Sequence, residues 1–136
     1  MKVIVCLDDC LGMMFNQRRQ SRDRAVISDI LRMTSGSRLY IDEYSEKLFA
    51  DSEGGYTVSR DMFGDAAEGE YCFVERQGLS PYVDGIEEIV IYRWNRRYPA
   101  DLFFDIDVEN IGFSMVQSED FEGYSHEKIT KEIFRR

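Results

Sequence analysis

The chain has 136 residues, of which 43% are hydrophobic and 13% aromatic, so it can bury one core but not two. We therefore expect a single domain over residues 1–136. The 26 Asp and Glu outnumber the 17 Lys and Arg, and the net charge of −9 disfavours general nucleic-acid binding, because the field of the chain repels a polyanion. Three cysteines without a CxxC spacing, and the lack of an apolar run long enough for a membrane span, favour a cytoplasmic protein with reduced thiols and no membrane partner.

The first half of the chain alternates apolar runs with helical patterns. The apolar run at residues 2–7 predicts a buried, central strand. Residues 12–20 are polar with a few apolar anchors, which predicts an ordered loop lying across the sheet. Ser21 is the expected N-cap of a helix over residues 22–34, whose apolar positions recur at helical spacing. A strand at 38–41, a short helix at 45–50 and a glycine turn at 54–55 are expected next.

The second half of the chain is rich in short strand patterns. They occur at residues 56–59, 70–75, 88–94, 101–106, 113–118 and 127–134, with a helical turn near 80–85. Strands that alternate with helices and then close on a hairpin predict an α/β sandwich. Its central sheet should be mostly parallel, with an antiparallel C-terminal hairpin.

Three segments in the last third follow one another in a recognisable order. They are Ile89-Val90-Ile91-Tyr92, Pro99-Ala100-Asp101-Leu102-Phe103-Phe104 and the terminal SHEKITKEIFRR. With the N-terminal VIVCLDDCLGMMFN, this order resembles a divergent, shortened dihydrofolate reductase, most closely over residues 89–136. The resemblance implies a three-layer dihydrofolate reductase-like sandwich in which the segment after the first strand is the mobile loop that closes over the substrate.

The cofactor motifs of that family are altered in this sequence. Family members that use a reduced nicotinamide cofactor bind its phosphates with a Gly-Arg-x-Thr turn and a later Gly-Gly pair, because glycines admit backbone amides and arginine pairs with phosphate. The corresponding turn here reads Asp42-Glu43-Tyr44-Ser45, so Glu43 replaces the cation and only Ser45 keeps a hydroxyl. The later segment, residues 73–78, has one glycine and no pair. Binding of NADPH in the family manner is therefore disfavoured, and the cofactor is left unassigned.

The substrate side departs from the family as well. The resemblance implies a buried carboxylate early in the first helix, but the matching position falls near Val26, about one turn from both Asp23 and Asp29. Tyr92 takes the place of a pocket threonine, and its bulk is expected to fill part of the pterin site. Classical dihydrofolate reduction is therefore disfavoured, and no catalytic residue is assigned.

Acidic residues follow several predicted strands. Asp8, Asp9, Asp42 and Glu43 stand at strand ends, where ligands of open α/β sheets usually bind. They are consistent with binding of a divalent cation or a basic ligand. The interpretation that we favour is that they are solvated loop residues, since Asp has ordinary turn-forming value. No metal is assigned.

Arginines cluster in two segments. Arg18, Arg19, Arg22 and Arg24 are placed to clamp a phosphate or carboxylate at the mouth of the cleft, or to pair with the surplus carboxylates of their own surface. In the second segment, residues 92–98, Trp94 and Tyr98 alternate with arginines. These aromatic residues are consistent with stacking on a nucleobase, and also with packing or with the contacts of a homodimer.

His126 is the sole histidine, which excludes a multi-histidine zinc centre within one chain. A Ser-His-Asp triad would have to use it. The interpretation that we favour is a hairpin histidine bonded to its own turn.

The sequence leaves two candidate functions open. The first is a small-ligand binding or interaction module without classical reductase activity, with Asp8, Arg18, Arg19, Arg22, Asp42, Glu43, Ser45 and Tyr92 as its candidate ligand residues. The alternative is an enzyme on the same scaffold. It would be either an NADPH-dependent reductase with an altered cofactor mode or a protein that acts on a nucleotide or RNA through the loop from Arg18 to Arg24.

Overall fold

The computed structural model describes residues 1–52 and 54–136, which build one large sheet and one small sheet. The large sheet contains β1 (Lys2–Leu7), β4 (Leu39–Ile41), β5 (Thr57–Val58), β6 (Tyr71–Phe73), β7 (Glu88–Arg93), β9 (Ser114–Phe121) and β10 (Ile129–Arg135). Its strand order is β5-β4-β6-β1-β7-β10-β9. Neighbours from β5 to β7 are parallel, whereas β10 pairs antiparallel with both β7 and β9. The predicted mostly parallel sheet with an antiparallel terminal hairpin is confirmed.

The small sheet corrects the expectation of a loop over residues 12–20. It consists of β2 (Gly12–Phe15), β3 (Arg18–Arg19) and β8 (Leu102–Phe103) in the order β3-β2-β8. Asn16 and Gln17 have φ angles of 52° and 62°, the backbone conformation that a tight two-residue hairpin requires. The strand expected at 101–106 is thus only two residues long, and it belongs to this second sheet.

Four helical segments accompany the sheets: α1 (Arg24–Met33), α2 (Glu46–Phe49), α3 (Met62–Asp65) and the 3₁₀ turn η1 (Ser80–Gly85). The sequence patterns did not predict α3. Asp23, and not Ser21, is the N-cap of α1, because its carboxylate accepts a hydrogen bond of 2.8 Å from the Ala25 amide. Among the described residues, no helix has both the length and the apolar character to cross a bilayer.

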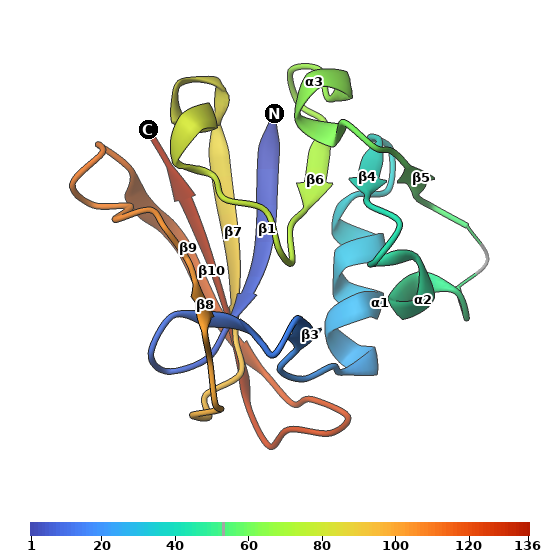
Figure 1. The fold of residues 1–136 in the computed structure, drawn as a ribbon, viewed down its shortest axis with the longest axis vertical. Coiled ribbons are helices and arrows are strands. Elements are labelled where there is room, and N and C mark those ends of the chain that lie inside the picture. Colours follow the sequence, from blue (N-terminus) through green and yellow to red (C-terminus); the bar gives the residue numbers. More distant parts are fainter. Residues whose placement is uncertain (53) are drawn as a thin grey trace.

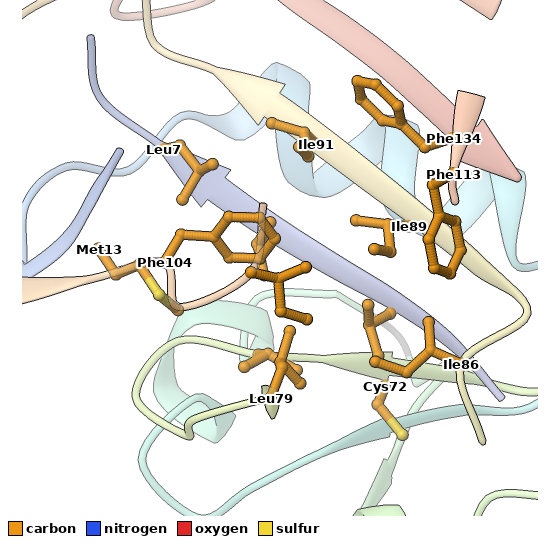
Figure 2. Packing of buried hydrophobic residues seen from close by; sticks show 14 of the residues in the cluster. Leu7, Met13, Cys72, Leu79, Ile86, Ile89, Ile91, Phe104, Phe113 and Phe134 are labelled. Carbon is orange, nitrogen blue, oxygen red and sulfur yellow. The ribbon is translucent and has the colours of Figure 1, made fainter. Parts of the chain in front are cut away.

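Both faces of the large sheet are buried at its central strands, whereas the edge strands β5 and β9 are largely exposed. Side chains alternate along each strand, so Ile4 and Val90 pack with Val26 and Ile30 of α1 on one face. Figure 2 shows the cluster on the other face, where Leu7, Ile89 and Ile91 of β1 and β7 lie near Phe104 and Phe113 from the connection that precedes β9.

The two ends of the large sheet differ. Figure 1 shows both termini at one end, while the connections after β1, after β7 and between β9 and β10 gather at the opposite end. These connections, together with β3 and the start of α1, position the candidate site.

A buried polar cluster lies between the sheet and α1. The Tyr92 hydroxyl donates a hydrogen bond of 2.6 Å to Asp29, whose carboxylate also pairs with Lys131 Nζ at 2.8 Å. Burial opposes ionisation of Asp29, but the hydrogen bonds from Lys131 and Tyr92 outweigh it and hold the pKa of Asp29 below its usual range. Burial and the Asp29 carboxylate raise the pKa of Tyr92, so this phenol stays protonated and donates.

Replacing Tyr92 by Phe tests this cluster. The substitution removes one buried hydrogen bond to a charged group, so we expect a loss of about 1–3 kcal/mol in the free energy of unfolding, measured by urea denaturation. Tyr82→Phe is the matched control, because Tyr82 is 45% exposed, and its effect should stay within about 0.5 kcal/mol. Equal stability of the two variants would contradict the assigned role.

Candidate functional site

A small cavity lies where β1 and β6 end, beside the residues that join β3 to α1. This is the carboxyl end of parallel strands, where ligands of α/β sheets bind. The cavity measures about 20 Å³, which is room for about one water molecule. Apolar side chains and a few polar ones line it, among them Cys6, Val26, Phe73, Arg19, Ser21 and Glu75.

An ion pair between Arg19 and Glu75 closes one side of the cavity. Arg19 Nε and Nη2 donate to the two Glu75 carboxylate oxygens at 2.8 and 3.0 Å, and Ser45 Oγ donates to Glu75 Oε1 at 2.7 Å. The hydrogen bond with Glu75 raises the pKa of Arg19. Arg19 and Ser45 were both candidate ligand residues, and the structure joins them through Glu75. Glu75 was overlooked, although the same strand-end rule that selected Asp42 applies to it.

Tyr44 holds the Arg19 side chain in place. The guanidinium carbon lies 4.6 Å from the centre of the Tyr44 ring, and Arg19 Nη2 donates to the Tyr44 carbonyl at 3.3 Å. The Tyr44 hydroxyl in turn accepts from the Arg19 amide at 2.8 Å. The β2–β3 hairpin is therefore tied to the turn after β4 by both backbone and side chain.

Asp42 organises that turn. Its carboxylate accepts from the Ser45 amide at 2.9 Å, from Arg76 Nε at 2.8 Å and from Gln77 Nε2 at 2.6 Å. Burial opposes ionisation, but these hydrogen bonds outweigh it and keep the pKa of Asp42 below its usual range. The neighbouring Glu43 points outward, and its carboxylate pairs with exposed Arg60 at 3.1 Å.

Asp8 has a similar role after β1. It is 1% exposed and accepts from the amides of Cys10, Gly12 and Tyr98 at 2.9, 2.7 and 3.0 Å, and from Gln20 Nε2 at 3.2 Å. Burial disfavours the charged form, but the amide hydrogen bonds dominate and lower the pKa of Asp8. Gly12 is required here, because a Cβ at this position would lie 2.6 Å from both Ala100 and Gln20. Asp8 therefore joins the loops after β1 and β7.

The other candidate residues are dispersed. Arg18 and Arg22 are exposed, and Arg22 lies on the rim of the cavity. Tyr92 lies in the core beneath α1, hydrogen-bonded to Asp29. Within residues 1–52 and 54–136, no group of three or more His, Cys, Asp or Glu side chains is arranged to hold a metal ion.

A second polar cluster, at the start of α1, was missed by sequence reasoning. His126 Nδ1 lies 2.9 Å from Asp23 Oδ2, and His126 Nε2 lies 3.1 Å from Ser21 Oγ and 3.0 Å from the Tyr98 hydroxyl. The prediction of a histidine bonded to its own turn was therefore wrong. Asp23 and His126 are 103 positions apart, and no local pattern connects them.

Comparison with known proteins finds a similar structure but no similar sequence. No protein-family model and no curated protein matches the sequence. Among solved structures, the chain is similar to a dihydrofolate reductase from Enterococcus faecalis complexed with NADP(H), with a TM-score of 0.68. The match covers 99% of this chain and 95% of that one.

The chain has a dihydrofolate reductase-like fold. The sequence identity of 11% makes it a divergent example, and at that distance the likeness establishes the fold alone. The resemblance seen in the sequence is thus confirmed for the architecture of the dihydrofolate reductase-like sandwich.

Acid titration tests the Asp42 turn. Because the pKa of Asp42 is depressed in the folded chain, its contribution to stability is present above its unfolded pKa of about 3.9 and is lost as the pH falls through the folded value. We expect Asp42→Asn to be less stable than the parent at pH 7, with a gap that narrows toward pH 2. Urea denaturation across this range measures the gap, and exposed Asp51→Asn is the control. A gap that stays constant with pH would rule out the proposed linkage.

Proposed function

We propose that this chain is a small-ligand binding or interaction module on a dihydrofolate reductase-like fold, without classical reductase activity. The observation that carries the proposal is the bridge of Arg19, Glu75 and Ser45. A cation and a hydroxyl that would suit a phosphate are both committed to an internal carboxylate. A dinucleotide would have to break these bonds before it gained any of its own.

The electrostatics of the same strand ends support this proposal. Asp42, Glu43 and Glu75 all lie at or near the turns that follow β4 and β6, so a pyrophosphate placed there would meet carboxylates. The similar Enterococcus faecalis enzyme was solved with NADP(H) bound. Here Glu43 stands in the turn where the family resemblance implies a cation. The turn therefore offers a carboxylate in place of that cation, and the nearby guanidiniums of Arg19, Arg60 and Arg76 already pair with Glu75, Glu43 and Asp42.

A thermal-shift titration with NADPH tests the proposal. We expect no change in the unfolding midpoint at millimolar NADPH, because Arg19 and Ser45 are already bonded to Glu75. Binding would be plainly visible in this assay, since a ligand at 100 times its Kd adds about 2.7 kcal/mol to the free energy of unfolding. The Enterococcus faecalis reductase is the positive control. A saturable rise in the midpoint that Ser45→Ala abolishes would overturn the proposal and favour a reductase with an altered cofactor mode.

Binding of a nucleotide or RNA is the second candidate function. It is favoured by the arginines of the segments at residues 17–24 and 92–98. Within the described part of the chain, no carboxylate lies within 4.0 Å of the guanidinium nitrogens of Arg18, Arg22, Arg24, Arg96 and Arg97. The two arginine-rich segments are also in contact, because Gln20 Nε2 donates to the Pro99 carbonyl at 3.2 Å and the Tyr98 hydroxyl donates to Ser21 Oγ at 3.3 Å. Unpaired guanidiniums in a chain of net charge −9 are available to an external anion.

The same thermal-shift assay separates the two candidates when short single-stranded RNA and a nucleoside triphosphate are added as further arms at low salt. RNA or nucleotide binding through these arginines should weaken as salt is raised and be lost in the double variant R18E/R22E. Arg60→Glu is a control for charge reversal away from these arginines, because Arg60 is 91% exposed and pairs with Glu43 elsewhere. Absence of any shift at low salt would eliminate the second candidate.

A further inference from the structure

A chain of hydrogen bonds runs from Asp23 through His126 to Ser21 at the wall of the cavity. The two steps measure 2.9 Å and 3.1 Å. Asp23 and His126 are only 3% and 4% exposed, whereas Ser21 is partly exposed and lines the cavity together with Arg22. A buried carboxylate, an imidazole and the hydroxyl of a partly exposed serine thus stand in the order in which a nucleophilic serine is activated.

The surroundings of Asp23 fix the tautomer of His126. The carboxylate also accepts from the amides of Ala25, Tyr124 and Ser125 at 2.8, 2.8 and 2.7 Å. Burial opposes ionisation, but the hydrogen bonds from His126 and these amides hold the pKa of Asp23 below its usual range. An ionised Asp23 retains the imidazole proton on Nδ1, which leaves the Nε2 lone pair directed at hydroxyl groups.

The imidazole is held rigidly. Trp94 stacks on it with ring centres 4.7 Å apart and an interplanar angle of 20°. Gly123 permits the close approach of the loop, because a Cβ there would lie 2.7 Å from both Asp23 Oδ2 and the His126 carbonyl. The Tyr98 hydroxyl lies 3.0 Å from His126 Nε2 and 3.3 Å from Ser21 Oγ, and it has one hydrogen to donate to either. When it donates to Ser21 Oγ, the hydroxyl hydrogen of Ser21 is free for His126.

We propose that Ser21, His126 and Asp23 form an acyl-transfer site that hydrolyses small esters with a short acyl group. Ser21 is the nucleophile, His126 is the general base, and Asp23 is a positioning residue. The small cavity limits the acyl group, and the unpaired guanidinium of Arg22 at its rim suits an ester whose alcohol part is anionic.

The reaction balances with water as the only co-reactant. Ser21 Oγ forms a bond to the ester carbonyl carbon as its proton passes to His126 Nε2. The ester C–O bond then breaks, and the departing alkoxide takes that proton, which leaves an acyl-Ser21. Water attacks the acyl carbon, gives a proton to Nε2, and releases the carboxylic acid as Ser21 recovers its hydrogen. None of these steps involves the turn after β4, so the site does not depend on whether that turn binds a dinucleotide.

Covalent labelling of the whole chain with a small alkyl fluorophosphonate, followed by intact-mass spectrometry and peptide mapping, tests the site. We expect one adduct on Ser21 that Ser21→Ala abolishes. Ser28→Ala is the matched control, because Ser28 is an exposed serine on the adjacent helix, and its labelling should equal that of the parent. An unlabelled parent chain, or an adduct that persists in Ser21→Ala, would overturn the proposal.

Asp23→Asn separates catalytic positioning from a structural role. Asparagine keeps an acceptor for the Ala25 amide, but its NH2 group replaces one of two oxygens that accept from backbone amides, so the unfolding midpoint should fall and labelling is compared at a temperature where both chains stay folded. The substitution also removes the charge that holds the imidazole proton on Nδ1. We expect the labelling rate to fall about 100-fold or more, together with the rate of p-nitrophenyl acetate hydrolysis. An unchanged labelling rate in Asp23→Asn would show that His126 does not activate Ser21.

Discussion

The bidentate ion pair between Arg19 and Glu75 is the interaction on which the architecture of the cavity depends. It joins the β2–β3 hairpin to the end of β6, and through Ser45 and Tyr44 it reaches the start of α2. The side chains of Arg19 and Glu75 are 19% and 9% exposed, so the pair is far better shielded than an ordinary surface salt bridge. Removing one partner of such a pair would leave the other charge buried and uncompensated.

Buried carboxylates explain how an acidic chain folds its loops at this end of the sheet. Asp8, Asp23 and Asp42 each accept several hydrogen bonds from backbone amides or side chains that would otherwise lack partners. Each of them stands at the end of a strand or the start of a helix. These three acidic residues thus anchor loops, while arginines without a carboxylate partner among the described residues remain exposed at the same end of the sheet.

The elements with clear periodicity were predictable from sequence. The apolar run of β1, the helical stripe of α1 and the pattern of the terminal strands gave the correct sheet, because each local pattern agreed with the tertiary packing. The β2–β3 hairpin was missed because its turn uses Asn16 and Gln17 without glycine. The N-cap was misplaced because Ser21 and Asp23 are both good capping residues, and only the structure shows which carboxylate or hydroxyl faces the amide.

The candidate site was less predictable than the fold. Arg19 and Ser45 were candidate residues, but their shared partner Glu75 lies 56 and 30 positions away along the chain. The contact of His126 with Asp23 is equally non-local. Propensity and spacing describe neighbours along the chain, whereas these contacts depend on which strand ends meet in space.

A double-mutant cycle on Arg19 and Glu75 is the most direct test of the closed cavity. Arg19→Met keeps the length of the side chain, and Glu75→Gln keeps an acceptor for Ser45, so the cycle isolates the ion pair. The free energy of unfolding of the parent, both single variants and the double variant should give a coupling energy of about 1–3 kcal/mol. A coupling below about 0.3 kcal/mol would contradict the account, because the two charges would then contribute independently and the ion pair would not be what holds the hairpin over the strand ends.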